Sequence, residues 1–186
     1  METNTLLVNL YSGPGAGKTS ICAGVFSKLK SLDIDCEMAL EYCKELIWDE
    51  SFKKLGNQIY IFGKQHDRLH RLQGKVEVVI TDSPILLSII YDRLTVNPTH
   101  HIFRDLVLSE YRKFYNLDFF VQRRDYFQQN GRMQNFDQAK VIDDSIHELL
   151  TENNVSYIVA DATNPVDDIC THIINYLNYQ QQNSLT

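Results

Sequence analysis

Residues 12–20 read Ser-Gly-Pro-Gly-Ala-Gly-Lys-Thr-Ser, and they directly follow the apolar run Leu6–Leu10. Glycine-rich loops that end in Gly-Lys-Thr between a strand and a helix turn their backbone N–H groups towards phosphate oxygens. The N-terminal end of the following helix adds positive potential at the same point. A surface turn rich in glycine and proline is the alternative, but the order of strand, loop and helix favours a nucleotide-phosphate site.

The residues of this loop have distinct predicted roles. Lys18 is predicted to reach the β- and γ-phosphates, and the Thr19 hydroxyl is predicted to bind Mg²⁺. Ser12 stands where the usual pattern has glycine, and serine adopts unusual backbone angles less readily. The predicted nucleotide-binding set comprises Ser12, Gly13, Pro14, Gly15, Ala16, Gly17, Lys18, Thr19 and Ser20.

Composition limits the class of protein. A chain of 186 residues with 44% hydrophobic content suits one domain with a sizeable core. The four cysteines form no C-x-x-C pair, which argues against a zinc site and predicts reduced thiols in a cytoplasm. No apolar run is long enough to span a bilayer, and the N-terminus lacks the pattern of a signal peptide. The net charge of −6 disfavours broad non-specific nucleic-acid binding without excluding a local basic groove.

Strand-like and helix-like segments alternate along the chain. Strands are predicted at 6–11, 34–40, 76–81, 116–121 and 155–160. Helices are predicted at 18–30, 43–55, 57–72, 85–91, about 99–114, 137–153 and 166–177, before a frayed polar tail over 178–186. Strands separated by helices predict an α/β fold, with a five-stranded parallel sheet and helices on both faces, formed by one domain over 1–186. Ligands of such sheets bind beyond the carboxyl ends of the strands.

Two carboxylates follow predicted strands at that edge. Asp82 follows a buried strand, as a Walker-B carboxylate does, and is placed to hold Mg²⁺ through water or to accept a hydrogen bond from Thr19. Its alternative role is to cap a helix near Pro84. Glu41 ends the second strand and fits the position of a general base, with Asp82 as the competing base. A glutamate that complements a helix dipole is the alternative for Glu41.

With these residues in place, the chain resembles the small P-loop kinases of the nucleoside and nucleotide kinase group. The resemblance rests on the phosphate loop, on Glu41-Tyr42-Cys43, on residues 80–84 (Ile-Thr-Asp-Ser-Pro) and on Gly-Arg-Met-Gln at 131–134. It covers nearly the whole chain and is strongest towards the nicotinamide-riboside-kinase-like branch and its phage-encoded relatives. It implies a three-layer P-loop kinase fold, ATP and Mg²⁺ as cofactors, metal binding by Thr19 and Asp82, and proton abstraction by Glu41.

The same resemblance implies a lid at about 122–137 and an acceptor side formed by helices at about 43–75. Kinases of this type bring lid arginines onto the transferring phosphate, and we expect Arg124 and Arg132 to do so, with Arg123 as a third candidate. A solvated charge run is the alternative. On the acceptor side, Gln58 and Gln65 are candidates for contacts to a base, whereas an ordinary core position is favoured for Phe62.

The predicted reaction is transfer of the ATP γ-phosphate to a hydroxyl of a nucleoside-type acceptor. The favoured acceptor is the 5-hydroxymethyl group of hydroxymethyluracil in phage DNA, and the chain would then act in a host cytoplasm. A free nucleoside or nucleotide, including nicotinamide riboside, is the alternative acceptor. Asp-Ser-Pro replaces the Asp-Arg of thymidylate and deoxynucleoside kinases, which argues against their substrates. An ATPase switch and an inactive P-loop protein are the remaining alternatives, and no obligate protein partner or oligomeric state is predicted.

Overall fold

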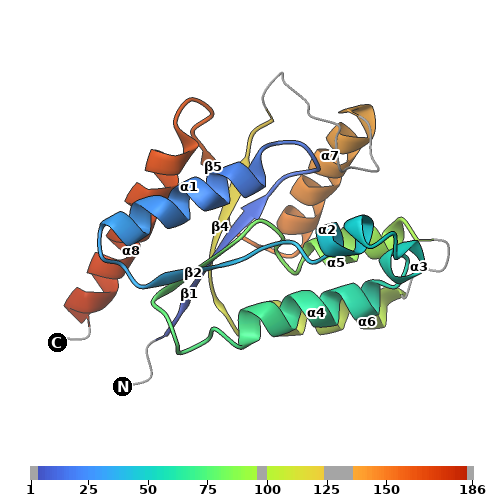
Figure 1. The fold of residues 1–186 in the computed structure, drawn as a ribbon, viewed down its shortest axis with the longest axis horizontal. Helices are drawn as coiled ribbons and strands as arrows, with labels where there is room; N and C mark the ends of the chain where they lie inside the picture. The colour runs from blue at the N-terminus through green and yellow to red at the C-terminus, as the bar shows by residue number, and fades with distance from the viewer. Residues whose placement is uncertain (1–3, 96–99, 124–135, 184–186) are drawn as a thin grey trace.

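The computed structural model describes residues 4–95, 100–123 and 136–183, and over these ranges the chain forms a parallel sheet of five strands (Figure 1). The strand order is β2-β3-β1-β4-β5, so that β1 lies in the middle of the sheet. Leu6 of β1 pairs with Val78 of β3 on one side and with Tyr115 of β4 on the other. The strands are β1 (Leu6–Tyr11), β2 (Cys36–Ala39), β3 (Val78–Thr81), β4 (Tyr115–Val121) and β5 (Ile158–Ala160).

All five predicted strands are present, and three of them begin later than predicted. β2, β3 and β5 start at Cys36, Val78 and Ile158. Asp33 and Asn154 adopt left-handed backbone angles, with φ of 58° and 54°, in the turns that follow two helices. Residues 34–35 and 155–157 lead out of these turns, and β2 and β5 begin after them.

The helices are α1 (Lys18–Ser31), α2 (Cys43–Trp48), α3 (Phe52–Leu55), α4 (Gln58–His70), α5 (Leu87–Arg93), α6 (His100–Tyr111), α7 (Phe136–Glu152) and α8 (Pro165–Asn183). The single helix predicted at 43–55 is wrong, because Glu50 adopts a φ of 52° and separates α2 from α3. The frayed tail predicted from residue 178 is also wrong as far as Asn183. Tyr176 and Leu177 pack against the core, and α8 continues beyond them with an exposed polar end.

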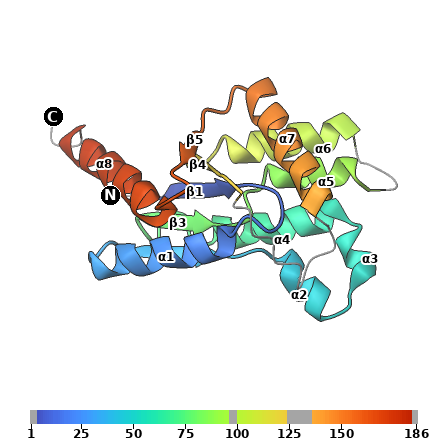
Figure 2. The ribbon, with the colours of Figure 1, turned by 90° about the horizontal axis from the view of Figure 1, so that it is seen from above.

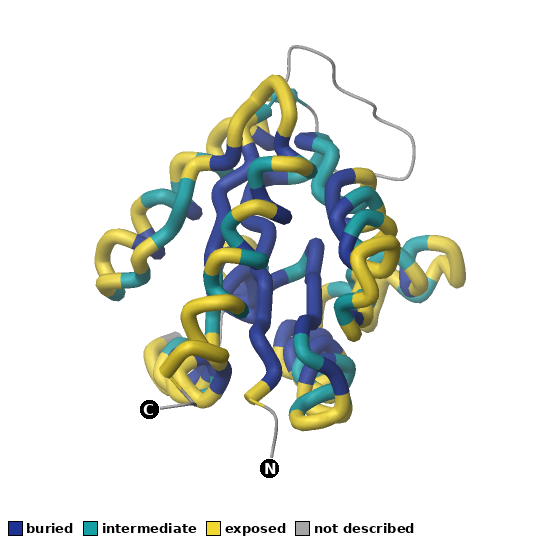
Figure 3. The backbone as a smooth tube through the Cα atoms, turned by 90° about the vertical axis from the view of Figure 1, so that its left-hand side faces the viewer, coloured by how far each residue is buried: buried dark blue, intermediate teal, exposed yellow. Residues whose placement is uncertain are grey.

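The helices cover both faces of the sheet, as predicted from the order of the elements. Leu6, Val8 and Leu10 of β1 face a core shared with α1 and α8, whereas Leu7 and Tyr11 face a core shared with α4, α5, α6 and α7. Figure 2 shows α1 and α8 on one side of the molecule and α5, α6 and α7 on the other. In Figure 3 the central strands are buried, while the outer faces of the helices are exposed. Strands covered on both faces are apolar throughout, which explains the unbroken apolar run of β1.

Within the described ranges, no helix has both the length and the apolar character to cross a bilayer.

One carboxylate lies inside the second of these cores. Asp118 of β4 is 5% exposed, and it accepts hydrogen bonds from the Asn9 side-chain amide at 3.0 Å and from the Tyr111 hydroxyl at 2.6 Å. Burial raises the pKa of Asp118 from 3.8 to about 6, and the hydrogen bonds that favour the charged form offset this only in part. The folded protein therefore holds this proton more tightly than the unfolded chain does.

We expect this group to make the protein less stable as the pH rises. A folded-state pKa above the unfolded value gives stability that is present below about pH 4 and is lost by about pH 6. The shift corresponds to at most about 3 kcal/mol in the free energy of unfolding. Asp118→Asn should remove this decline, as measured by urea unfolding between pH 4 and 7. Asp144→Asn, at an exposed position in α7, is the control and should keep the decline of the parent protein.

Candidate functional site

The loop between β1 and α1 has the backbone that its glycines predict. Gly15 and Gly17 adopt left-handed φ values of 88° and 90°, which residues with side chains rarely adopt. No described side chain caps the first turn of α1, and that turn holds no acidic residue. Its N–H groups are therefore available to an anion. The Lys18 ammonium folds over the loop and donates to the carbonyls of Ser12 at 2.7 Å and Gly13 at 3.1 Å.

The first two residues of the loop contact α7. The Ser12 hydroxyl donates to Oδ1 of Asp143 at 3.0 Å, and the Gly13 N–H donates to the same atom at 2.5 Å. Ser12 is not among the described non-glycine residues with positive φ, so the conformational cost expected for a serine is absent. Gly13 also has no left-handed angle. A Cβ atom at Gly13 would lie 2.5 Å from the carbonyl oxygen of Ala139, so glycine is required here because α7 packs directly on the loop.

Gly13→Ala should therefore separate the loop from α7. The contact is with backbone, which cannot rotate away, and we expect a loss of about 1–3 kcal/mol in the free energy of unfolding. Thermal and urea unfolding measure this directly. Gly63→Ala in α4 is the matched control, because a Cβ there meets nothing within 4 Å and alanine favours helix. Equal stability of the two variants would contradict the predicted clash.

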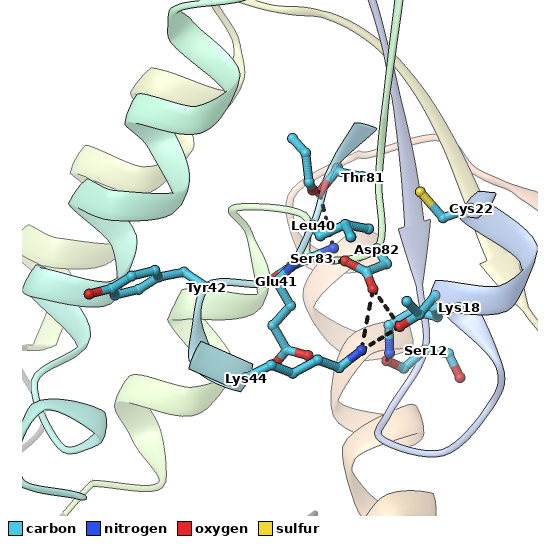
Figure 4. Close-up of polar contacts among 12 residues, drawn as sticks. Ser12, Lys18, Cys22, Leu40, Glu41, Tyr42, Lys44, Thr81, Asp82 and Ser83 are labelled. Atoms are coloured by element: carbon cyan, nitrogen blue, oxygen red, sulfur yellow. Dashed lines mark hydrogen bonds and ion pairs between the residues drawn. The ribbon is translucent and has the colours of Figure 1, made fainter. Parts of the chain in front are cut away.

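A hydroxyl, a carboxylate and an ammonium group meet beside the loop, at the carboxyl ends of β1 and β3 (Figure 4). The Thr19 hydroxyl donates to Oδ2 of Asp82 at 2.5 Å and accepts from Nζ of Lys44 at 2.6 Å. The Lys44 Nζ lies 3.8 Å from the same Asp82 oxygen. Asp82 is 3% exposed, and its Oδ1 accepts from the Glu41 N–H at 2.9 Å. The sequence-predicted pair of Thr19 and Asp82 is thus brought together, and Asp82 also holds the end of β2.

The capping role considered for Asp82 is not observed. α5 begins at Leu87, five residues beyond Asp82, and it has no side-chain cap. The Asp82 carboxylate instead bonds to the Thr19 hydroxyl and the Glu41 backbone. The hydrogen bond from Thr19 is the one predicted from the sequence, and the role of Asp82 in catalysis stays a prediction.

The electrostatic surroundings of Lys18 are mixed. Burial lowers the pKa of its ammonium group, and the carboxylates of Glu41, Asp82 and Asp143 act in the opposite direction. The Glu41 carboxylate therefore interacts electrostatically with the Lys18 ammonium. Its side chain extends from the end of β2 towards the side on which Lys44 lies (Figure 4). Burial and, to a smaller extent, the charge of Glu41 also raise the pKa of Tyr91 in α5.

Of the lid predicted at 122–137, the structure describes only residues 122–123 and 136–137. Arg124 and Arg132 lie outside the described residues. Arg123, the third candidate, bonds to Asp143 through Nε at 2.9 Å and donates from NH1 to the Pro14 carbonyl at 2.6 Å. Its side chain is 8% exposed. Arg123 therefore connects the end of β4, the phosphate loop and α7.

On the acceptor side, the polar residues proposed for base contacts are engaged within the fold. The Gln65 side chain is 3% exposed and accepts from the Tyr42 N–H at 3.2 Å. The Gln58 amide donates to the Leu55 carbonyl at 3.2 Å. Phe62 lies in the core, as favoured from the sequence. At the surface of the same region, the Tyr42 and Tyr60 hydroxyls are 2.6 Å apart.

A cavity of about 590 Å³ lies near the amino ends of β1 and β4, away from the phosphate loop. It is lined by Thr5 before β1 and Tyr115 at the start of β4, together with His66, Lys75 and Glu110. Parallel sheets bind nucleotides at the carboxyl ends of their strands, so its position separates this cavity from the phosphate loop.

Sequence reasoning missed Lys44, Asp143 and Tyr91. Lys44 follows Glu41 by three residues, and this short spacing at a strand end was the signal that could have identified it. Asp143 and Tyr91 lie within α7 and α5, and nothing in their local sequence distinguishes them from ordinary helix residues.

Comparison with known proteins agrees with this architecture. A family model described as an AAA domain (AAA_28) matches residues 7–166. Comparison with the curated proteins finds no match. A solved structure of NadR protein in complex with NR is similar, with a TM-score of 0.65, 14% identity, and coverage of 89% of this chain and 50% of that one. The chain thus spans about half the length of that relative.

Two further similar structures match over nearly their whole length. Thymidylate kinase from Ehrlichia chaffeensis has a TM-score of 0.63 and 12% identity, with 94% of this chain and 99% of that one covered. Deoxyadenosine kinase from M. mycoides with bound dATP has a TM-score of 0.54 and 18% identity, with 92% and 99% covered. At these identities the likeness establishes the fold, which is the P-loop kinase fold with a five-stranded parallel sheet.

Proposed function

Because this chain belongs to the AAA domain family AAA_28 and has a P-loop kinase fold, we propose that it is an ATP-dependent phosphotransferase acting on a hydroxyl group of a nucleoside-type acceptor. The observation that carries the proposal is the placement of Lys18, the Thr19–Asp82 pair and Glu41 around the phosphate loop. Phosphoryl transfer needs positioned phosphates, neutralised charge and an acceptor oxygen in line, and these residues can supply each requirement.

The residues present suit Mg²⁺. A hydroxyl and a buried carboxylate 2.5 Å apart are oxygen ligands of the kind that magnesium uses, and the ammonium of Lys44 beside them supports a position that favours cations. Thr19 would bind the ion, with Asp82 acting directly or through water. Bound there, magnesium would neutralise charge on the phosphates. The described residues hold no cluster of three or more His, Cys, Asp or Glu, which agrees with a site completed by phosphates and water.

The remaining steps belong to the side chains of this protein. N–H groups of the loop and the Lys18 ammonium would hold the phosphate oxygens. Glu41 would accept the proton of the acceptor hydroxyl while the oxygen of that hydroxyl bonds to the γ-phosphorus. The bond from that phosphorus to the β–γ bridging oxygen breaks, and ADP leaves. Lys18 and Arg123 would stabilise the charge on the transferring group.

The acceptor class is decided by one assay. Labelled γ-phosphate would be followed from ATP to free nucleosides and nucleotides, to duplex DNA containing 5-hydroxymethyluracil, and to unmodified DNA. Label in the modified DNA alone would support the DNA acceptor that the sequence favours. Two of the basic residues in 64–75 have other surroundings than a DNA backbone, because Arg68 pairs with Glu45 and Lys75 lines the cavity away from the phosphate loop.

Label in a free nucleoside or nucleotide would identify a kinase of soluble acceptors. Release of phosphate without label in any acceptor would contradict the proposal and favour an ATPase. Lys18→Met protein, measured in parallel, would show which transfer depends on the described site.

A further inference from the structure

The geometry points to Lys44 as a built-in cation that holds the Thr19–Asp82 pair and that magnesium must displace when it binds. This inference rests on the proposed use of the pair for Mg²⁺, and it adds a residue that neither the motif nor the family match assigns. Its starting point is the contact of the Lys44 ammonium with the Thr19 hydroxyl at 2.6 Å and its approach to Asp82 at 3.8 Å (Figure 4).

The two cations compete for the same negative potential beside the Thr19 hydroxyl and the Asp82 carboxylate. A hydroxyl has one proton and two lone pairs. The Thr19 hydroxyl donates a hydrogen bond to Asp82 and accepts one from Lys44, so that the ammonium lies beside the oxygen through which Thr19 would bind a metal. Magnesium binds oxygen at about 2.0–2.1 Å. An ammonium 2.6 Å from that oxygen and a doubly charged ion bound to the same oxygen would repel each other strongly.

Lys44 is built to move, whereas its partners are not. The side chain of Lys44 is 43% exposed, and that of Asp82 is 2% exposed. Lys44 is the second residue of the short helix α2, so its long side chain can turn into solvent while the backbone stays in place. Asp82 is held by Glu41 and Thr19 at fixed distances. Without metal, Lys44 neutralises the buried carboxylate of Asp82. Magnesium that binds there therefore gains less binding free energy than it would beside an unpaired carboxylate.

Two opposite effects of Lys44→Met follow. Without metal, nucleotide binding should weaken, because a positive charge is lost next to the phosphate loop. The gain in nucleotide affinity on adding Mg²⁺ should be larger than in the parent protein, because magnesium no longer displaces an ammonium group. The ratio of the nucleotide dissociation constants in EDTA and in Mg²⁺ should therefore increase by about fivefold or more over the parent protein.

The experiment is a titration of each protein with a fluorescent ATP analogue, first in EDTA and then at increasing Mg²⁺ without any acceptor. Lys53→Met, an exposed lysine of α3 without a described contact, is the matched control for the loss of one charge. Lys44→Arg, which keeps the charge, should stay close to the parent. Thermal unfolding in EDTA should show a folded Lys44→Met protein of slightly lower stability.

An unchanged ratio in folded Lys44→Met, or an equal change in Lys53→Met, would overturn the role of Lys44 and leave the proposed kinase activity standing. Failure of the parent protein to bind the analogue in either condition would contradict the proposed function, and the competition with it. Because no acceptor is present, the result does not depend on which hydroxyl is phosphorylated.

Discussion

Lys18→Met should lower the rate of phosphoryl transfer by about 10²–10³-fold, as expected when a preorganised charge contact to the transition state is lost. Lys18 begins α1, and its ammonium now bonds to two carbonyls of the loop, at Ser12 and Gly13. On nucleotide binding it can exchange those carbonyls for phosphate oxygens, which carry more charge. Single-turnover transfer at saturating nucleotide separates this effect from weaker binding.

The matched control is Lys30→Met at the other end of α1, where the side chain is 41% exposed and its ammonium lies 3.6 Å from Asp35. We expect its rate to stay within about twofold of the parent, since surface ion pairs contribute little. A Lys18→Met protein that keeps the parental rate would exclude the mechanism proposed here. Equal losses in both variants would indicate a general effect on the helix.

Asp82→Ala should have the second-largest effect, because one side chain has two separate roles. It would remove the acceptor for the Thr19 hydroxyl and for the Glu41 N–H, and leave the Lys44 ammonium without its carboxylate. Polar groups left without partners in a buried position cost about 1–3 kcal/mol in the free energy of unfolding. Transfer should fall by about 10- to 100-fold or more, as for other residues that orient a metal site.

Asp82→Asn separates the two roles of this residue. The amide oxygen can still accept from the Glu41 N–H, so we expect most of the stability to return in urea unfolding. The negative charge is lost, so the magnesium dependence of transfer should stay impaired. Full recovery of both stability and activity in Asp82→Asn would mean that the charge of Asp82 is not needed.

The fold could be predicted well because its signals are local. β1 is apolar along its whole length, the loop glycines lead into a helix, and each later strand is separated from the next by helical periodicity. Boundaries could not be predicted so well. The break after α2 depends on Glu50, a residue that adopts left-handed angles only because the chain must turn towards α3. α8 continues to Asn183 through an exposed polar end, which apolar periodicity does not predict.

The candidate site could be predicted only where its polar residues directly follow the end of a strand. Thr19, Glu41 and Asp82 could be identified from position, because the carboxyl ends of parallel strands meet at one edge. Lys44 could have been identified only through its short spacing from Glu41, and Asp143 could not be identified in this way. Asp143 reaches Ser12 and Gly13 from a helix about 130 residues further along the chain, and no local pattern records that contact.

The amino-acid sequence by itself determined the parallel sheet, the phosphate loop and the residue types available for phosphoryl transfer, because periodicity, glycine placement and strand ends are properties of neighbouring residues. Only the tertiary structure decided how those residues are used. It placed the Lys44 ammonium on the Thr19 hydroxyl, made Gly13 necessary through the approach of α7, and bonded Arg123 to the loop. The physical reason is that such contacts depend on packing between distant elements, which a single segment of sequence does not encode.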